Sequence, residues 1–271
     1  MPGLRPLPFS AETMKRILQR IWSIWFYILF VGFFALIFPL HWLLLKSKAR
    51  WAHNLSHRLN MIWGYVIMYP VGIWVVTEGR SRIRRKQTYI FAPNHSSYLD
   101  IPICNVSVIP TFRFIGKAEL NSTPLFGYMF KRLHIPVNRG SVTESYKSFL
   151  HAKEVLKGGT SVLVFPEGTI PDKTKVTLLR FKDGAFRMAI ENKIPIVPVT
   201  IIGADRALPD NGKFLVQPTI VRVVFHEPIE TKDMVVAQAA ELKERVYEII
   251  HERLTGKKSP EARAEAVVEG K

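Results

Sequence analysis

The stretch that decides the fold is Thr88-Tyr-Ile-Phe-Ala-Pro-Asn-His-Ser-Ser-Tyr-Leu-Asp100. Its short apolar run, Tyr89 to Ala92, predicts a buried strand, which the following proline ends. Ser96 or Ser97 is then a suitable N-cap for a helix, so we expect His95 between the end of a strand and the start of a helix. In open α/β sheets, ligands bind at that edge, outside the carboxyl ends of the strands.

His95 is followed five residues later by Asp100. A carboxylate at this distance can fold back to the imidazole, fix its tautomer and support its positive charge. The alternative is a polar helix cap with a helix-facing His, which is the usual explanation of a lone His. No Ser or Cys nucleophile lies at a recognisable elbow nearby. We therefore interpret the pair as a general base and its orienting acid, acting on a hydroxyl of the substrate.

Strand-like and helical runs alternate in the rest of the chain. The strand-like runs cover residues 112–115, 134–137, 161–165, 196–202 and 219–225, and the helical runs cover 143–157, 183–192 and 232–254. This alternation predicts an α/β fold, a mainly parallel sheet flanked by helices on both faces. We expect the domain to span residues 88–254. The charged tail, residues 255–271, is expected to be disordered.

The N-terminal part has a different composition. Residues 21–45 contain no Lys, Arg, Asp or Glu, and they exceed the roughly 20 residues that a bilayer-spanning helix needs. A buried hydrophobic helix is the alternative. A second apolar run, residues 61–76, is interrupted by Gly and Pro; it could re-enter the membrane, lie in its interface or form the second leg of a hairpin. We expect residues 1–87 to form a membrane-anchoring helical segment.

The net charge of +16 is unevenly distributed. Residues 1–90 carry 13 Lys and Arg against two acids, and the remainder carries 25 against 20. Such asymmetry predicts an anionic partner, either nucleic acid or an anionic membrane surface. The sequence has no recognisable nucleic-acid reader motif, so we favour the membrane surface. The single cysteine, Cys104, excludes an internal disulfide and a Cys-rich metal site.

Further polar residues are expected at the same sheet edge. Lys117 follows the second strand, although a single lysine is more often just a surface residue, and Arg139 ends the third. Glu167 and Gly168 follow a strong strand, where the glycine permits a turn whose amides face an anion; an ordinary turn with a solvated Glu is the alternative. Lys182 is a further candidate phosphate contact. This set fits acyl transfer onto a hydroxyl next to a phosphate.

The motifs, taken in order, resemble those of the glycerolipid acyltransferases. The series is Asn94-His95-(four residues)-Asp100, Gly116-Lys117-Ala-Glu-Leu120, Arg139-Gly140, Phe165-Pro-Glu-Gly-Thr169 and Val197-Pro-Val199. The similarity spans roughly residues 88–202 and is closest to the 1-acyl-glycerol-3-phosphate (lysophosphatidic acid) acyltransferases. It implies a glycerol-3-phosphate acyltransferase-like fold and neither a metal nor a prosthetic group.

The resemblance also assigns roles. His95 deprotonates the acceptor hydroxyl and Asp100 orients it, so that the hydroxyl attacks the thioester of acyl-CoA or acyl-carrier protein. The expected substrate-binding residues are Asn94, Lys117, Arg139, Glu167, Gly168, Thr169 and Lys182. The implied function is the synthesis of phosphatidic acid from lysophosphatidic acid, in phospholipid biosynthesis. The enzyme would be membrane-bound, and a thioester donor requires its catalytic domain on the cytoplasmic face.

One departure concerns the acceptor. The third motif of the family usually continues with Arg after Phe-Pro-Glu-Gly-Thr, but Ile170 stands here. A phosphate ligand is therefore missing unless a nearby basic residue replaces it: Lys173, Lys175, Arg180 or Lys182. A lyso-amino-acid lipid, such as lyso-ornithine lipid, is an alternative acceptor. A catalytically idle lipid-binding protein on the same fold is a further alternative, which the intact His–Asp pair disfavours.

Overall fold

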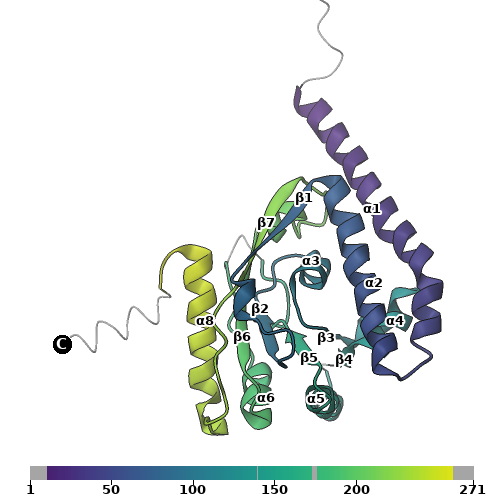
Figure 1. The fold of residues 1–271 in the computed structure, drawn as a ribbon. Helices are drawn as coiled ribbons and strands as arrows, with labels where there is room; N and C mark the ends of the chain where they lie inside the picture. The colour runs from purple at the N-terminus through teal and green to yellow at the C-terminus, as the bar shows by residue number, and fades with distance from the viewer. Residues whose placement is uncertain (1–10, 139, 173–175, 259–271) are drawn as a thin grey trace, which may run out of the picture.

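The computed structural model describes residues 11–138, 140–172 and 176–258, which form a seven-stranded sheet covered by helices on both faces (Figure 1). The strand order is β1-β7-β6-β2-β5-β3-β4. The strands are β1 (Ile73–Glu78), β2 (Ile90–Pro93), β3 (Phe112–Lys117), β4 (Ile135–Val137), β5 (Ser161–Val164), β6 (Ile196–Ile202) and β7 (Thr219–Phe225). Strands β2 to β6 run parallel and β1 pairs in parallel with β7, so among the strand pairs of the described residues only β6–β7 is antiparallel. The predicted α/β class with a mainly parallel sheet is confirmed.

The helices form two layers, one on each face of the sheet. They are α1 (Ala11–Leu44), α2 (Arg50–Met68), α3 (Asp100–Ser107), α4 (Phe126–Leu133), α5 (Val142–Lys157), α6 (Gly184–Asn192), α7 (Ala204–Ala207) and α8 (Ala239–Thr255). Helices α1 to α4 share one buried apolar cluster with the sheet, and α5, α6 and α8 share the other. The pleat of β2 supplies both clusters, since Phe91 lies in the first and Ile90 and Ala92 lie in the second.

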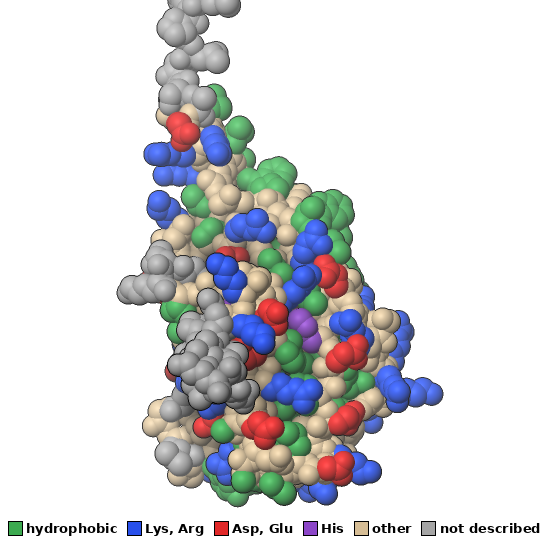
Figure 2. All heavy atoms as spheres, turned by 90° about the vertical axis from the view of Figure 1, so that its left-hand side faces the viewer, with side chains coloured by type: hydrophobic (Ala, Val, Ile, Leu, Met, Phe, Trp, Pro, Cys, Tyr) green, Lys and Arg blue, Asp and Glu red, His purple; other side chains and the backbone are tan. Residues whose placement is uncertain are grey.

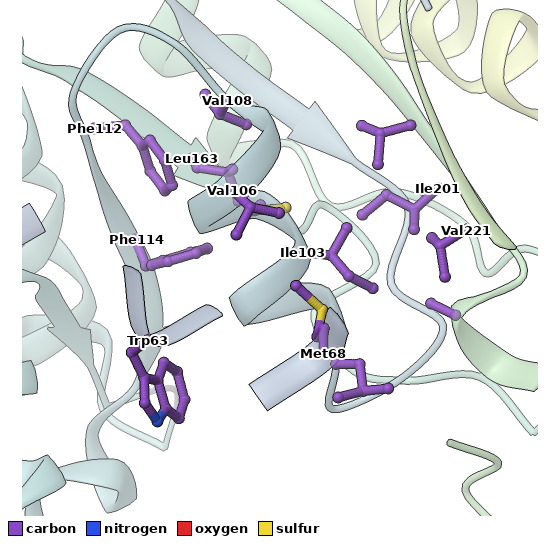
Figure 3. Close-up of a cluster of buried hydrophobic side chains, with 14 of the residues drawn as sticks. Trp63, Met68, Ile103, Val106, Val108, Phe112, Phe114, Leu163, Ile201 and Val221 are labelled. Atoms are coloured by element: carbon purple, nitrogen blue, oxygen red, sulfur yellow. The ribbon is translucent and has the colours of Figure 1, made fainter. Parts of the chain in front are cut away.

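Helix α3 lies at the centre of the first helical layer and directly follows the loop after β2. Figure 3 shows Ile103 and Val106 of α3 pointing into the apolar cluster between α2, represented by Trp63 and Met68, and the strands. Ile103 is fully buried. Burying side chains of this size contributes about 1.5–3 kcal/mol each. The start of α3, and with it the loop before the helix, is therefore fixed by the core.

Helix α1 packs along the domain by one face only. Its buried residues Ser23, Phe26 and Phe34 lie three and eight positions apart, on one side of the helix. The indole N–H of Trp63 donates to the carbonyl oxygen of Phe30 (3.0 Å), and the Val216 amide donates to Ser23 Oγ (2.9 Å). Among the described residues, α1 is the helix long and apolar enough to cross a membrane, with a mean hydropathy of 2.3.

The second apolar run divides into a helix and a strand. Its first part completes α2, and its last part is β1, which pairs in parallel with β7 from Ile73↔Thr219 to Glu78↔Val224. The β1 strand was not predicted, and it lies on the N-terminal side of the expected domain boundary at residues 87/88. Helix α8 ends at Thr255, and residues 259–271 of the predicted tail lie outside the described residues.

Candidate active site

The loop between β2 and α3 brings His95 and Asp100 together. The His95 Nδ1 lies 2.8 Å from Asp100 Oδ2, and the Asp100 side chain is fully buried. A carboxylate at this position accepts the Nδ1 proton, so the neutral imidazole keeps its lone pair on Nε2. The His95 side chain is 17% exposed and lines a cavity. Its Nε2 is therefore the basic atom available to a substrate.

Asp100 is held independently of His95. The backbone amides of Ser96 and Ser97 both donate to Asp100 Oδ2, the latter over 2.9 Å. The predicted N-cap role of Ser96 or Ser97 was wrong, because α3 begins only at Asp100 and its N-cap residue is Leu99. The Ser97 hydroxyl instead donates to the carbonyl oxygen of Leu208 (2.9 Å). The residues before α3 thus form a turn around the carboxylate, which fixes its position before substrate binds.

Glu167 fixes the loop that carries His95 through hydrogen bonds. Its Oε1 accepts the His95 amide proton (2.6 Å), its Oε2 accepts that of Leu179 (2.8 Å), and the residue is only 3% exposed. Hydrogen bonds from amides to a buried carboxylate are among the stronger ones in proteins. In this geometry Glu167 acts on the position of His95. Direct contact with a substrate stays a prediction.

Asn94 is a positioning residue as well. Its Oδ1 accepts the amide proton of Ile201 (2.7 Å), and its Nδ2 donates to the carbonyl oxygen of the same residue (3.0 Å). The side chain is 1% exposed. Its amide is buried and engaged with β6, where it holds the end of β2 against the neighbouring strand; binding of substrate by Asn94 stays a prediction.

A largely apolar cavity of about 190 Å³ opens beside His95. The Phe165 ring stacks against the His95 imidazole with their centroids 4.1 Å apart. Apolar and aromatic side chains form most of the remaining wall: Tyr98, Ile101, Phe114, Ile115, Leu120, Phe130 and Ile170. These residues come from α3, β3, α4, the segments next to these elements and the loop after β5. The sequence alone gave little indication of most of them. The cavity has the character of a site for a hydrocarbon chain.

Polar residues lie on the same cavity wall. Lys117, Gly168 and Thr169, all expected from the sequence, line it. Ile170 lines it too, so an apolar side chain occupies the wall where the family usually has an arginine. Asp210, which no sequence motif indicated, adds a carboxylate. Lys117 is the cation among the described lining residues.

The remaining predicted cations lie elsewhere. Lys182 lines a neighbouring cavity and packs against Gly168, whose φ of +77° is in the left-handed region. Arg180 Nη1 pairs with Glu244 Oε1 at 3.1 Å, so it does not replace the missing arginine. Arg139, like Lys173 and Lys175, lies outside the described residues. Within the described parts of the chain, no group of three or more His, Cys, Asp or Glu could hold a metal ion.

The fold and site define an α/β domain with a His–Asp pair beside an apolar cavity, and comparison with known proteins shows which proteins it resembles. Residues 75–202 match the family model named Acyltransferase. The crystal structure of the 1-acyl-sn-glycerophosphate (LPA) acyltransferase PlsC from Thermotoga maritima superposes with a TM-score of 0.71 at 25% identity, covering 87% of this chain and 94% of that chain.

Curated relatives are named 1-acyl-sn-glycerol-3-phosphate acyltransferases. A 1-acyl-sn-glycerol-3-phosphate acyltransferase of Saccharomyces cerevisiae is 31% identical over 67% of this chain and 60% of its own length. A chloroplastic one of Arabidopsis thaliana is 29% identical over 64% of this chain and 48% of its own. The chain thus spans about half the length of the first curated relatives it matches. These matches confirm the resemblance to the glycerolipid acyltransferases that the motif series predicted.

Proposed function

We propose that this protein transfers a fatty acyl group from a thioester donor to the free hydroxyl of lysophosphatidic acid, giving phosphatidic acid. The observation that carries the proposal is the His95–Asp100 pair, 2.8 Å apart and beside an apolar cavity. Curated relatives named 1-acyl-sn-glycerol-3-phosphate acyltransferases support it. The domain would thereby serve phospholipid biosynthesis.

The reaction follows from the free Nε2 of His95. This atom removes the proton of the acceptor hydroxyl while the hydroxyl oxygen attacks the thioester carbonyl carbon. The carbon–sulfur bond then breaks, and the departing thiolate takes the proton from the imidazolium. Asp100 stabilises the imidazolium and holds its orientation. General-base catalysis of this kind contributes about 10²- to 10⁴-fold to the rate.

The apolar and polar parts of the cavity wall suit different ends of the substrates. Its aromatic and aliphatic wall suits an acyl chain next to the reacting carbonyl. Lys117, the cation among the described lining residues, suits the acceptor phosphate. Thr169 and the turn at Gly168 lie on the same wall, and we assign them to the polar part of the acceptor. The donor is acyl-CoA or acyl-carrier protein.

We further propose that the protein is attached to a membrane through the outward face of α1. Large apolar side chains are exposed along this face, among them Ile24, Val31 and Leu36, the last of which is 73% exposed. Figure 2 shows hydrophobic side chains gathered near the upper end of the molecule, towards the projecting part of α1. Apolar surface of this extent is unfavourable in water and favourable in lipid. Such attachment would bring the cavity to its lipid substrates, on the cytoplasmic side where thioester donors occur.

The direct test is an acceptor and donor screen with the purified protein. Lysophosphatidic acid is compared with lyso-ornithine lipid, each with acyl-CoA and with acyl-carrier protein, and the acylated product is quantified by mass spectrometry. We expect phosphatidic acid as the main product, formed at least about 100-fold more slowly by the His95→Ala variant. Acylation of the amino-acid lipid alone would overturn the acceptor assignment. No acyl transfer with any pair, from folded wild-type protein, would overturn the enzymatic function.

A further inference from the structure

A second cavity system lies at the amino-terminal edge of the sheet. Two adjoining cavities of about 290 and 330 Å³ share Arg50, Asn54, Thr111 and Thr160 as lining residues. Thr111 precedes β3, whereas Lys117 of the reaction cavity ends the same strand. At about 3.3 Å per residue, six residues of strand separate the two places by roughly 20 Å. We call this cavity pair the basic groove; it is distinct from the reaction cavity.

Five basic side chains from three segments line the basic groove. Lys48 lies just before α2 and Arg50 begins that helix, Arg85 and Lys86 come from the segment before β2, and Arg113 comes from β3. These segments are far apart in the sequence, and the fold brings them to one place. Helix α2 begins here without a side-chain cap, so the positive end of its dipole adds to the charge.

Acidic side chains do not balance this charge. Glu154 is the carboxylate among the described lining residues, and its Oε1 lies 3.5 Å from Lys157 Nζ. In the described part of the chain, none of the five basic residues has a carboxylate within ion-pair distance. Arg50 donates instead to the carbonyl oxygen of Gly159 (3.0 Å). On the face shown in Figure 2, by contrast, Lys and Arg are mixed with Asp and Glu.

Arg113 is the least exposed of the five basic residues of the groove. It is partly buried, and desolvation lowers the pKa of its guanidinium. Burial, and next the charge of Arg113, also lower the pKa of the His151 imidazole in the same cavity wall. A guanidinium withdrawn from water without a counter-ion is unfavourable. A phosphate group would restore paired hydrogen bonds to it.

We propose that the basic groove binds a phosphate-bearing anion, at a site separate from the reaction cavity. A lipid headgroup phosphate and a soluble phosphate compound share the chemistry that the groove recognises. Its position suits a lipid source, because Lys48 follows closely on α1, whose exposed Trp42 and Leu43 continue the apolar face to this end of the helix. An anionic lipid held here would fix the domain against the bilayer.

The test measures binding of the full chain in detergent micelles and on vesicles. Inorganic pyrophosphate is titrated by calorimetry, and flotation is measured on phosphatidylcholine vesicles with and without phosphatidylglycerol. The first groove variant carries Arg50→Gln and Arg113→Gln. The second groove variant, Arg85→Gln with Lys86→Gln, changes only exposed side chains, so a loss of binding in it cannot be attributed to misfolding. A charge-matched control changes exposed lysines outside the groove: Lys232→Gln with Lys257→Gln.

We expect binding to weaken about tenfold for each groove cation removed, with the control within twofold of wild type. Because α1 would hold every variant on vesicles of either composition, loss of the additional flotation that phosphatidylglycerol gives over phosphatidylcholine alone assigns a lipid phosphate. Loss of pyrophosphate binding alone assigns a soluble one. Unchanged binding in both groove variants, or an equal loss in the control, overturns the proposal. The result is independent of the proposed reaction: the groove variants should keep wild-type kcat in micelles, and His95→Ala should keep the phosphate binding.

Discussion

Replacing Glu167 by Gln distinguishes two roles for this carboxylate: holding the loop that carries His95, and contacting the acceptor. In the structure, its two oxygens accept the amide protons of His95 and Leu179 while the residue is buried. A glutamine side chain keeps one acceptor and turns its NH₂ group towards the second amide. The variant thus loses a hydrogen bond to a charged group, worth about 1.5–3 kcal/mol, and leaves a buried donor unsatisfied.

We expect the Glu167→Gln variant to be less stable and slower. The free energy of unfolding should fall by about 2–3 kcal/mol, measured by urea titration. A displacement of His95 by about 1 Å would lower kcat by about 100-fold, with little change in the KM for lysophosphatidic acid. Glu230→Gln, a change at an exposed carboxylate, is the control and should leave both quantities unaltered.

An effect on KM rather than on kcat and stability would contradict a positioning role for Glu167. If Glu167 contacts the acceptor, the KM for lysophosphatidic acid should rise tenfold or more in Glu167→Gln, with stability and kcat near wild type. Steady-state kinetics over a range of acceptor concentrations, together with the urea titration, distinguishes the two outcomes. A hydrogen-bonding role for the carboxylate also predicts intermediate behaviour for Glu167→Asp, whose shorter side chain reaches only one amide.

Three further changes test other parts of the site and fold. Asp100→Asn puts a neutral amide opposite His95 Nδ1, so kcat should fall about 10²- to 10⁴-fold in steady-state acyl transfer. Gly168→Ala adds a Cβ at φ +77° and 2.9 Å from the Lys182 side chain, so the free energy of unfolding should fall by about 1–2 kcal/mol. Burial lowers the pKa of His57 to about 4. The unfolded chain therefore binds more protons between pH 4 and 6.5, and stability should fall as pH drops through this window, by up to about 3 kcal/mol. His57→Leu should flatten that dependence, measured by urea titration at each pH.

Each of these expectations has a contrary result. Wild-type kcat in Asp100→Asn would show that the carboxylate does not orient the base. Undiminished stability of Gly168→Ala would show that the turn tolerates a side chain. A pH dependence in His57→Leu as steep as in wild type would assign the effect to other groups.

The sequence predicted the parts of the fold that form continuous patterns. The bounds of β6 and β7 agree with the expected runs because each is a single apolar stretch with clear ends. The strand β1 was missed, because its residues continue the apolar run of α2 without a break in composition. Only the pairing with β7, about 146 residues later in the chain, makes that segment a strand.

The sequence predicted the contact between His95 and Asp100 better than the rest of the site's geometry. His95 and Asp100 lie close in the chain, so a local turn suffices to bring them together. Asn94 belongs to the same motif but binds the backbone of Ile201, a partner that spacing cannot reveal. Asp210 and most of the apolar cavity wall come from separate loops and elements. Their convergence depends on the tertiary structure.

Acyl transfer by His95→Ala, measured with lysophosphatidic acid and a thioester donor, tests most directly whether His95 is the general base. We predict a loss of at least about 10²-fold in kcat, with a wild-type melting curve and wild-type vesicle binding, because the proposed role of His95 is that of the base and its side chain contributes little to the core. A variant that keeps kcat within tenfold of wild type would contradict the assignment of His95 as the base.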